Sequence, residues 1–289
     1  MGGNWISGYA DVEAGALYHG DCREMLRSFA TETNRPTIAL AFTSPPYGLG
    51  LEYERRSTVA DWVAVQRDVL ELLVPLLAPT GSICWQVGTH VNPRTGGIVP
   101  LDAVLVPVLL DLGLTVRTRM VWAFRHGQHA RHRLSGRHET VVWATKSNAR
   151  GGYVFDLDPL RVPQRFPSKR HYRGPRRGEL SCNPKGANPG DVWCIPNVRH
   201  NHPERTAAHP CQMPLELAER WILALTALGD LVLDPFAGVG TTVAAAVLHG
   251  RHAAGADLHR PYLDVAARRV QQAREGALPR RAWSGQLSP

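Results

Sequence analysis

Residues 231–242 read Leu-Val-Leu-Asp-Pro-Phe-Ala-Gly-Val-Gly-Thr-Thr, and this stretch decides the fold. The apolar run that ends at Asp234 predicts a buried strand, and the glycines predict a turn into a helix that begins at Thr241. At Gly238 and Gly240 no Cβ keeps a ligand away from the backbone, so the turn predicts a site for a nucleotide-like cofactor. The third glycine of the dinucleotide fingerprint is missing, because Val243 stands in its place, and this disfavours NAD and FAD.

A second strand is predicted over residues 252–257, and it ends in the carboxylate of Asp257. Neighbouring parallel strands end at the same edge of a sheet, so Asp257 is expected beside the glycine turn. A carboxylate in that place would accept hydrogen bonds from ribose hydroxyls. The alternative is that Asp257 caps the helix that begins near Pro261.

The rest of the chain alternates short β-branched runs with longer amphipathic ones, which is typical of an α/β fold with a mostly parallel sheet. Two more strands are predicted, over residues 37–43 and 82–87. Helices are predicted over residues 61–77, 99–112, 214–228, 241–249 and 261–272. Segments 115–123 and 139–145 have no helical run between them, so they predict an antiparallel pair at the edge of the sheet.

The formal charge of the chain is +8, and its basic residues are concentrated in one region. Residues 117–205 hold 18 lysines and arginines against 6 aspartates and glutamates, whereas the other 200 residues hold 15 and 19. Within this region, residues 150–205 contain 14 glycines and prolines and no sustained periodicity, which predicts a functional insertion. The charge favours a polyanion such as nucleic acid as partner, although a solvated basic surface would have the same composition.

Composition also excludes several classes of protein. A chain of 289 residues with 44% apolar residues is neither disordered nor a small disulfide scaffold. Five cysteines at irregular spacing and no signal-peptide pattern predict free thiols and a cytoplasmic protein. The apolar runs are shorter than the roughly 20 residues that a membrane-spanning helix requires, so no membrane association is expected.

The second informative stretch is Thr43-Ser44-Pro45-Pro46-Tyr47, which directly follows a predicted strand. The two prolines hold the backbone extended and remove two N–H donors, so that carbonyl oxygens project without competition, and Tyr47 adds a flat aromatic face. This arrangement predicts a place for a planar group that carries an amine. Taken alone, the motif could also be a rigid turn that closes a strand.

These two motifs, in this order, resemble those of the amino-methylating DNA methyltransferases of the permuted kind called the beta group. In that family a Ser/Asp/Asn-Pro-Pro-Tyr/Phe motif precedes the target-recognition region, which precedes an Asp-Pro-Phe-x-Gly-x-Gly-Thr-Thr cofactor loop. Gly20-Asp21 and the segment 209–215 also resemble segments of the family, so the resemblance covers nearly the whole chain. It implies an α/β, Rossmann-like methyltransferase sheet, mostly parallel with an antiparallel edge hairpin, and an irregular target-recognition insertion.

The resemblance also implies how the chain is divided. Residues 1–148 would form the catalytic half of the methyltransferase domain, 149–206 the target-recognition region, 207–276 the cofactor-binding half and 277–289 a flexible tail.

The family motifs assign roles to individual residues, for S-adenosylmethionine as cofactor and with no metal. The catalytic residues would be Ser44, Pro45, Pro46 and Tyr47. The cofactor-binding residues would be Asp21, His209, Pro214, Asp234, Pro235, Phe236, Gly238, Gly240, Thr241, Thr242 and Asp257. The DNA-binding residues would be Arg125, Arg131, Arg133, Lys169, Arg170, Arg173, Arg176 and Arg177.

The implied reaction is methyl transfer to an exocyclic amine of a base flipped out of the duplex. The Ser44 side chain and the Pro45 carbonyl would accept hydrogen bonds from the amine, and Tyr47 would stack on the base. Serine is the usual residue of the family for cytosine N4, and aspartate is its usual residue for adenine N6, so cytosine N4 is favoured. Alternatives are adenine N6 methylation, an RNA methyltransferase, an inactive DNA-binding module on the same fold, and a nucleotide-binding oxidoreductase.

The expected partner is double-stranded DNA, with a cognate restriction endonuclease as a second partner, in a monomer or homodimer of bacterial, archaeal or phage origin. The recognised DNA sequence does not follow from the residues, because readout depends on where the insertion places its side chains in the grooves.

Overall fold

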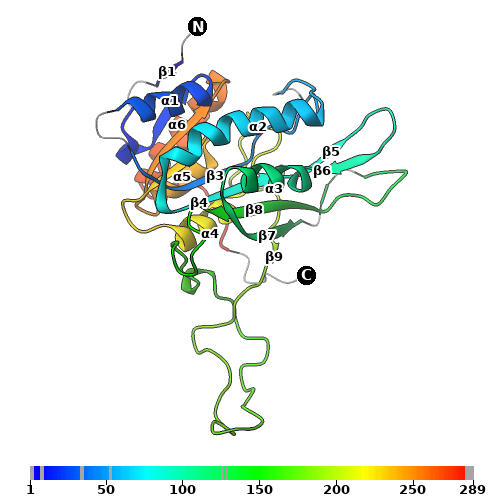
Figure 1. Ribbon diagram of the computed structural model, residues 1–289, viewed down its shortest axis with the longest axis vertical. Coiled ribbons are helices and arrows are strands. Elements are labelled where there is room, and N and C mark those ends of the chain that lie inside the picture. Colours follow the sequence, from blue (N-terminus) through cyan, green and yellow to red (C-terminus); the bar gives the residue numbers. More distant parts are fainter. Residues whose placement is uncertain are drawn as a thin grey trace.

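The computed structural model describes residues 3–6, 10–32, 36–51, 54–124, 126–127 and 129–283, and one mixed sheet dominates it (Figure 1). In the described part of the chain this sheet has the strand order β1-β2-β11-β10-β3-β4-β8-β7-β9. The bounds are β1 Asn4–Trp5, β2 Ala16–His19, β3 Ile38–Thr43, β4 Leu77–Val87, β7 Thr115–Ala123, β8 His138–Thr145, β9 Val192–Cys194, β10 Leu231–Asp234 and β11 His252–Asp257. A separate hairpin pairs β5 Thr89–Val91 with β6 Ile98–Pro100.

The five central strands β2, β11, β10, β3 and β4 run parallel. Strands β10 and β11 come from the C-terminal part of the chain, yet they lie between β2 and β3 from the N-terminal part. Strands from both parts of the chain therefore build one sheet, and side chains from both contribute to each of its two apolar clusters. This confirms the predicted α/β fold with a mostly parallel sheet.

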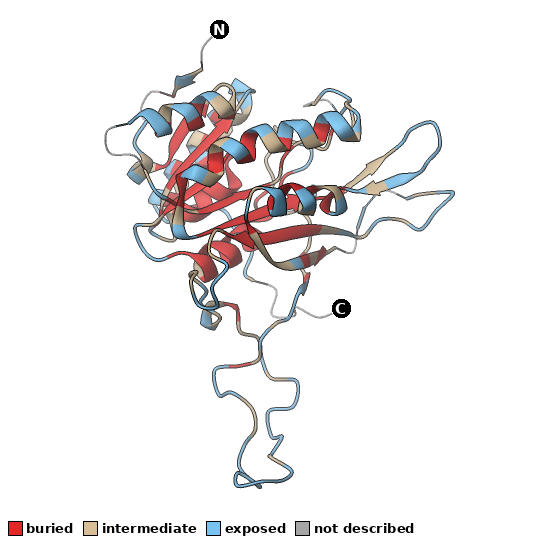
Figure 2. Ribbon diagram, viewed as in Figure 1, coloured by how far each residue is buried: buried red, intermediate tan, exposed pale blue. Residues whose placement is uncertain are grey.

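Helices cover both faces of the sheet (Figure 1). On one face α1 Cys22–Thr31, α2 Val59–Leu73 and α3 Leu101–Asp111 pack against one another, and on the other α4 Leu215–Leu225, α5 Thr241–Leu248 and α6 Arg260–Arg274 do the same. Each layer has its own cluster of buried apolar side chains, one around Leu70 and Leu105, the other around Trp221 and Val243. Figure 2 shows the buried residues concentrated in the strands and on the inner sides of these helices.

The bounds of all five predicted helices differ in the structure by one to four residues, and for two of them the cause is clear. Helix α2 ends at Leu73 and continues as a short 3-10 turn that contains Pro75, because proline cannot donate to the preceding turn of a helix. Strand β4 consequently begins at Leu77, inside the helix predicted over 61–77. Helix α3 begins only at Leu101, since the preceding residues 98–100 pair with β5.

The antiparallel pair of β7 and β8 is confirmed, but it is not the edge of the sheet. The three residues of β9 pair parallel with β7 and take the edge position. Neither β9 nor the N-terminal strands β1 and β2 were predicted. Strands of two to four residues are too short for a periodic pattern to reveal them.

The irregular segment 150–205 is largely a projection from the sheet. Residues 161–190 form a long lobe that extends below the body in Figure 1 and is mostly exposed in Figure 2. Isolated bridges between Val162 and Ala187 and between Arg170 and Leu180 join its two limbs. We refer to residues 161–190 as the basic lobe.

The described part of the expected tail packs against the body. Leu278 is buried, and the Trp283 indole nitrogen donates to the buried Glu219 carboxylate at 2.6 Å. The expectation of a flexible tail from residue 277 therefore needs correction as far as residue 283, because apolar burial and this hydrogen bond hold the segment. Residues 284–289 lie outside the described residues. None of the described helices has the length and apolar character that a membrane crossing requires.

Candidate active site

Four neighbouring strands end at one edge of the sheet and carry the predicted site residues. Strand β3 leads directly into Ser44, β10 ends at Asp234, β11 ends at Asp257, and Asp21 follows two residues after β2. Because these strands are parallel and adjacent, residues more than 200 positions apart in the sequence meet at this edge.

The buried carboxylate of Asp234 joins the two sequence motifs. Its Oδ1 accepts hydrogen bonds from the Thr43 hydroxyl at 2.5 Å and from the Phe236 backbone N–H at 3.1 Å. Burial raises the pKa of Asp234 to about 6, against the opposing effect of the hydrogen bond from Thr43. Asp234 thus holds the start of the catalytic motif beside the start of the cofactor loop, residues 235–240.

The two glycines of the cofactor loop have positive φ angles, but different neighbours. A Cβ at Gly238 would meet only the His209 ring, at 3.7 Å, whereas one at Gly240 would lie 2.6 Å from the Ala266 Cβ on α6. At Gly240 the missing side chain therefore makes room for α6, a reason that the sequence did not indicate. Gly238 is the position of the loop where the backbone is left open beside His209.

The other predicted residues of the loop and of the following helix start point mainly inward. Pro235, Thr241 and Thr242 are buried, while Phe236 is half-buried and meets Trp85 edge to face, with 6.3 Å between ring centroids. Contacts from this loop to a cofactor would therefore come from the backbone and from the Phe236 ring.

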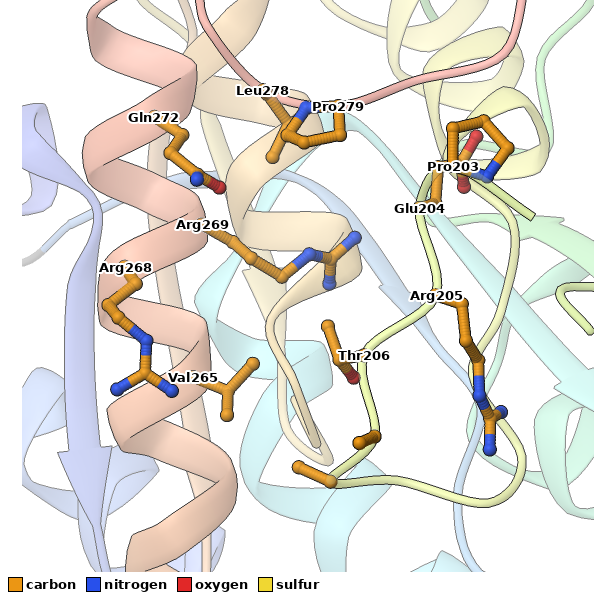
Figure 3. Close-up of a pocket in the computed structure, with 12 residues that line it drawn as sticks. Pro203, Glu204, Arg205, Thr206, Val265, Arg268, Arg269, Gln272, Leu278 and Pro279 are labelled. Carbon is orange, nitrogen blue, oxygen red and sulfur yellow. The ribbon is translucent and has the colours of Figure 1, made fainter. Parts of the chain in front are cut away.

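A cavity of about 400 Å³ lies on the α6 side of the cofactor loop (Figure 3). Arg269 of α6 lines it and donates to the Val239 carbonyl at 2.6 Å and to the Thr241 hydroxyl at 3.0 Å. Burial lowers the pKa of Arg269 to about 10. None of the predicted cofactor residues lines this cavity, so it backs the loop and is separate from the edge where the strands end.

Asp257 holds the cofactor loop from the neighbouring strand. Its Oδ2 accepts from the Gly238 N–H at 2.9 Å, and its Oδ1 accepts from the His259 N–H at 2.7 Å, directly before α6. Burial raises the pKa of this carboxyl, while the two backbone donors oppose the rise. Asp257 thus lies beside the glycine turn, as expected for neighbouring parallel strands, and it also accepts from the residue that directly precedes α6.

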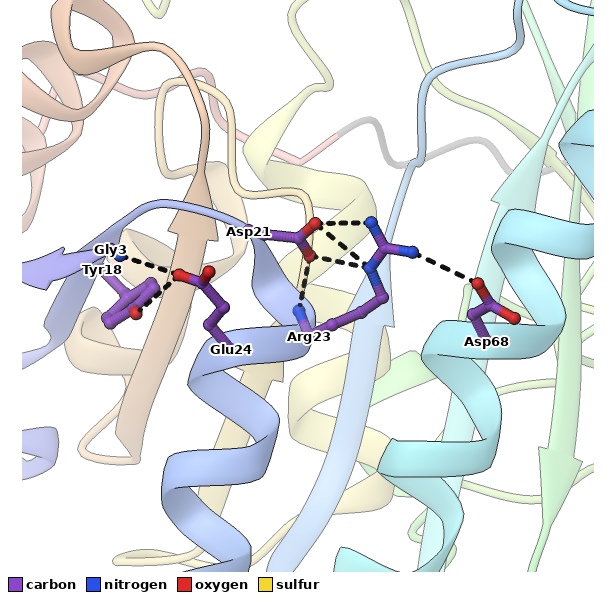
Figure 4. Close-up of polar contacts among 6 residues, drawn as sticks. All are labelled: Gly3, Tyr18, Asp21, Arg23, Glu24 and Asp68. Atoms are coloured by element: carbon purple, nitrogen blue, oxygen red, sulfur yellow. Dashed lines mark hydrogen bonds and ion pairs between the residues drawn. The ribbon is translucent and has the colours of Figure 1, made fainter. Parts of the chain in front are cut away.

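Asp21 is at the tip of the next strand and forms an ion pair (Figure 4). It accepts from the Arg23 backbone N–H at 2.8 Å and pairs with the Arg23 guanidinium at 2.6 Å, and that guanidinium also reaches Asp68 at 3.2 Å. The hydrogen bond from Arg23 lowers the pKa of Asp21. One third of the Asp21 side chain remains exposed at the site edge.

His209 and Pro214 approach the loop from the segment before α4. Pro214 is buried and precedes the first turn of α4. The His209 Nδ1 accepts from the Cys211 N–H at 3.1 Å, and its ring lies 4.8 Å from that of Tyr262. Burial, with the Arg205 and His259 charges, lowers the pKa of His209 to about 4, so the ring is neutral at pH 7.

The catalytic motif has one carbonyl in use and one that is open. The Trp62 indole of α2 donates to the Pro46 carbonyl at 2.8 Å. For the Pro45 carbonyl, the described residues supply no hydrogen-bond donor. The Ser44 Oγ lies 3.4 Å from the Tyr47 hydroxyl. The expectation that the carbonyl oxygens of this motif have no competing donor therefore needs correction for Pro46, whose carbonyl accepts from Trp62.

Sequence reasoning missed three residues that contact the catalytic motif, namely Trp62, described above, Gln86 and Glu139. The Tyr47 hydroxyl donates to Glu139 of β8 at 3.1 Å, and Gln86 of β4 donates its side-chain amide to the same carboxylate. Strands β4 and β8 are paired, which brings these two side chains together. No pattern in the sequence could have located them, because a strand pairing across about 50 residues has no local signal.

The predicted DNA-binding residues fall into two groups, while Arg125 lies outside the described residues. Arg131 and Arg133 are exposed in the connection between β7 and β8, which lies at the catalytic edge since Thr140 pairs with Val87 at the end of β4. The second group is exposed on the basic lobe and comprises Lys169, Arg170, Arg173, Arg176 and Arg177. In the described ranges, no group of three or more His, Cys, Asp or Glu side chains is placed to hold a metal ion.

Residues 38–268 match a protein-family model whose description is DNA methylase, and this span includes both the catalytic motif and the cofactor loop. Type II methyltransferase M.BglII of Bacillus subtilis is 43% identical to this chain over 250 residues, which are 86% of this chain and 67% of that protein.

Solved structures have the same fold. PvuII DNA methyltransferase, described as cytosine-N4-specific, has a TM-score of 0.67 at 20% identity and covers 91% of this chain and 92% of its own. TTHA0409 of Thermus thermophilus, solved with S-adenosyl-L-methionine, has a TM-score of 0.61 at 26% identity and covers 90% of this chain and 94% of its own.

Proposed function

We propose that this chain, which belongs to the DNA methylase family that its residues 38–268 match, methylates the N4 amine of cytosine in double-stranded DNA. As a member of that family it is an S-adenosylmethionine-dependent DNA methyltransferase of the kind that acts on cytosine N4 or adenine N6. The observation that supports the proposal is the Ser44 side chain, next to a Pro45 carbonyl without a donor among the described residues, on the strand end that Asp234 joins to the cofactor loop.

The residues around the cofactor loop fit S-adenosylmethionine, which when bound supplies an electrophilic methyl group on a positively charged sulfur. The half-buried Phe236 ring offers an aromatic face to that charge. The neutral state of His209 avoids a second positive charge close by. Asp257 retains acceptor capacity for ribose hydroxyls, since a carboxylate has about four acceptor positions and two are in use. We assign the adenine contact to Asp21.

The catalytic motif would act on the target amine by hydrogen bonding. The lone pair of an exocyclic amine is delocalised into the base, so the nitrogen is a poor nucleophile. Acceptors on both N–H groups, the Ser44 Oγ and the Pro45 carbonyl, would raise the electron density on nitrogen as positive charge develops there. The Tyr47 ring would stack on the flipped base and align it for attack.

Serine supports cytosine N4 over adenine N6 as the target. A neutral hydroxyl is a far weaker proton acceptor than the aspartate that is usual for adenine in this family. Mass spectrometry of nucleosides from DNA methylated by the protein is expected to detect N4-methylcytosine. N6-methyladenine in its place would overturn the choice of base and support the second candidate, an adenine N6 methyltransferase, with the same site.

Residues 149–206 are proposed as the target-recognition region, between the catalytic half, 1–148, and the cofactor-binding half, 207–276. The basic lobe and the β7–β8 connection expose arginines that suit DNA phosphates. A cognate restriction endonuclease as partner is supported by the type II name of the Bacillus subtilis relative. The expectation of a monomer or homodimer stays a prediction.

Removing two charges from the basic lobe is expected to weaken DNA binding without sequence preference. The double variant Arg173→Gln and Arg177→Gln should lower the salt dependence of log K by about 1 for each phosphate that the protein no longer neutralises. Fluorescence anisotropy over a range of salt concentrations measures this. Arg274→Gln on α6 is the matched control, since Arg274 is exposed outside the lobe. An unchanged salt slope in the double variant would remove these arginines from the DNA interface.

A further inference from the structure

We propose that Glu139 is a positioning residue for methyl transfer, because it fixes the direction of a hydrogen-bond chain that runs through Tyr47 to Ser44. The inference rests on the function proposed above. It assigns to Glu139 a role in presenting Ser44 to the target amine as an acceptor.

Three side chains form the chain of contacts. The Tyr47 hydroxyl donates to the Glu139 Oε2 at 3.1 Å, and the Ser44 Oγ lies 3.4 Å from the Tyr47 hydroxyl oxygen. The Gln86 side-chain amide donates to the same Glu139 oxygen and lies 3.5 Å from the Tyr47 hydroxyl. The Ser44 contact is at the long end of hydrogen-bond distances, and catalytic contacts commonly shorten when substrate binds.

The charge of Glu139 decides which group donates to which. An ionised carboxylate only accepts hydrogen bonds, so Tyr47 directs its single hydroxyl hydrogen at Glu139. The Tyr47 oxygen can then only accept, and Ser44 directs its own hydrogen at Tyr47. The lone pairs of Ser44 are left for an amine N–H. If Glu139 were neutral, Tyr47 could turn its hydrogen toward Ser44, and Ser44 could present a hydrogen to the amine, which would repel it.

Glycine at position 88, where β4 ends, makes room for this pair. A Cβ at Gly88 would lie 2.8 Å from the Tyr47 ring and 3.4 Å from the Glu139 Oε1. The Tyr47 ring therefore lies against Gly88, and the hydroxyl at its tip contacts Glu139 and Ser44.

The surroundings of Glu139 make its charge sensitive to pH. The groups that face it are the Tyr47 hydroxyl and the Gln86 amide, both uncharged, while Arg137 and His138 precede it in the chain. Burial raises the pKa of Glu139, and the hydrogen bonds from Gln86 and Tyr47 oppose this. Glu139 therefore takes up its proton at a higher pH than an ordinary glutamate. Methyl transfer is expected to fall as the pH drops through that raised pKa.

The test is a double-mutant cycle of Glu139→Gln and Tyr47→Phe, measured as single-turnover methyl transfer to DNA over a range of pH. Each single variant is expected to slow the transfer step roughly 10- to 100-fold, with S-adenosylmethionine binding near wild type. Because both act on one chain, the double variant should be no slower than the slower single variant. Glu139→Gln should also lose the acidic limb of the pH profile that wild type has. Glu71→Gln on the exposed side of α2 is the control and should match wild type.

The outcomes separate this inference from the proposed function. A wild-type protein that methylates no amine in DNA overturns the proposed function and the inference together. An active wild type with equally active Glu139→Gln overturns only the inference, and so does a double variant whose loss is the product of the two single losses. If Glu139→Gln does not fold, Tyr47→Phe still decides, since it removes the same donor and must flatten the acidic limb.

Discussion

Replacing Ser44 with alanine is expected to lower the rate of methyl transfer by about 100- to 1,000-fold. The substitution removes one of the two acceptors that would raise electron density on the target amine, at the moment when positive charge develops there. The cofactor loop is held by Asp234, Asp257 and Arg269 and does not involve Ser44. S-adenosylmethionine should therefore bind as in wild type.

The measurement combines single-turnover transfer of a labelled methyl group to DNA with calorimetry of cofactor binding. Ser28→Ala is the matched control, because Ser28 lies within α1 and its hydroxyl donates to the Met25 carbonyl of the same helix. A Ser44→Ala protein that transfers methyl groups at the wild-type rate would refute the role of Ser44. A loss of cofactor binding in the same variant would instead indicate that the strand edge had been disturbed.

Asp257→Ala is expected to weaken S-adenosylmethionine binding by about 100-fold. The carboxylate accepts from the Gly238 and His259 backbone N–H groups, so its removal leaves two donors unpaired and loosens the loop. It also removes the acceptor assigned to the ribose. The bond from a ribose hydroxyl to this carboxylate would contribute about 1.5–3 kcal/mol, and the upper end of that range corresponds to a loss of about 100-fold.

Calorimetry with S-adenosylmethionine measures this effect directly. Asp264→Asn on the following helix, α6, is the control, since Asp264 forms an exposed pair with Arg260 at 2.8 Å, and such pairs contribute little. If Asp257→Ala bound S-adenosylmethionine with wild-type affinity, the alternative role of Asp257, as a cap at the start of α6, would be the one that remains.

The α/β fold could be predicted from local sequence because its signals are local. The run 231–242 combines a buried strand, a glycine turn and a helix start, and the structure has β10, the turn and α5 at these positions. Hydrophobic periodicity also located the long helices, although Pro75 and the pairing of residues 98–100 moved two boundaries. Strands β1, β2 and β9 were not predicted, because two to four residues are too few to show a hydrophobic period.

Within the site, the residues of the two motifs could be predicted, and the residues that hydrogen-bond to them could not. Ser44 and Asp257 lie at strand ends as expected. The contact of Asp234 with Thr43 spans 191 positions and that of Tyr47 with Glu139 spans 92, and neither leaves a trace in local sequence. These contacts arise only because strands from distant parts of the chain become neighbours in one sheet.

Sequence by itself determined the fold class, the family and the order of the motifs, since each depends on residues close together in the chain. Tertiary structure alone decided why Gly240 is a glycine, because the atom that a side chain would meet belongs to Ala266 of α6. It also decided which carbonyl of the proline pair is open, through the indole of Trp62. The physical reason is the same in each case, since packing and hydrogen bonding depend on proximity in space, which the sheet creates after the local elements have formed.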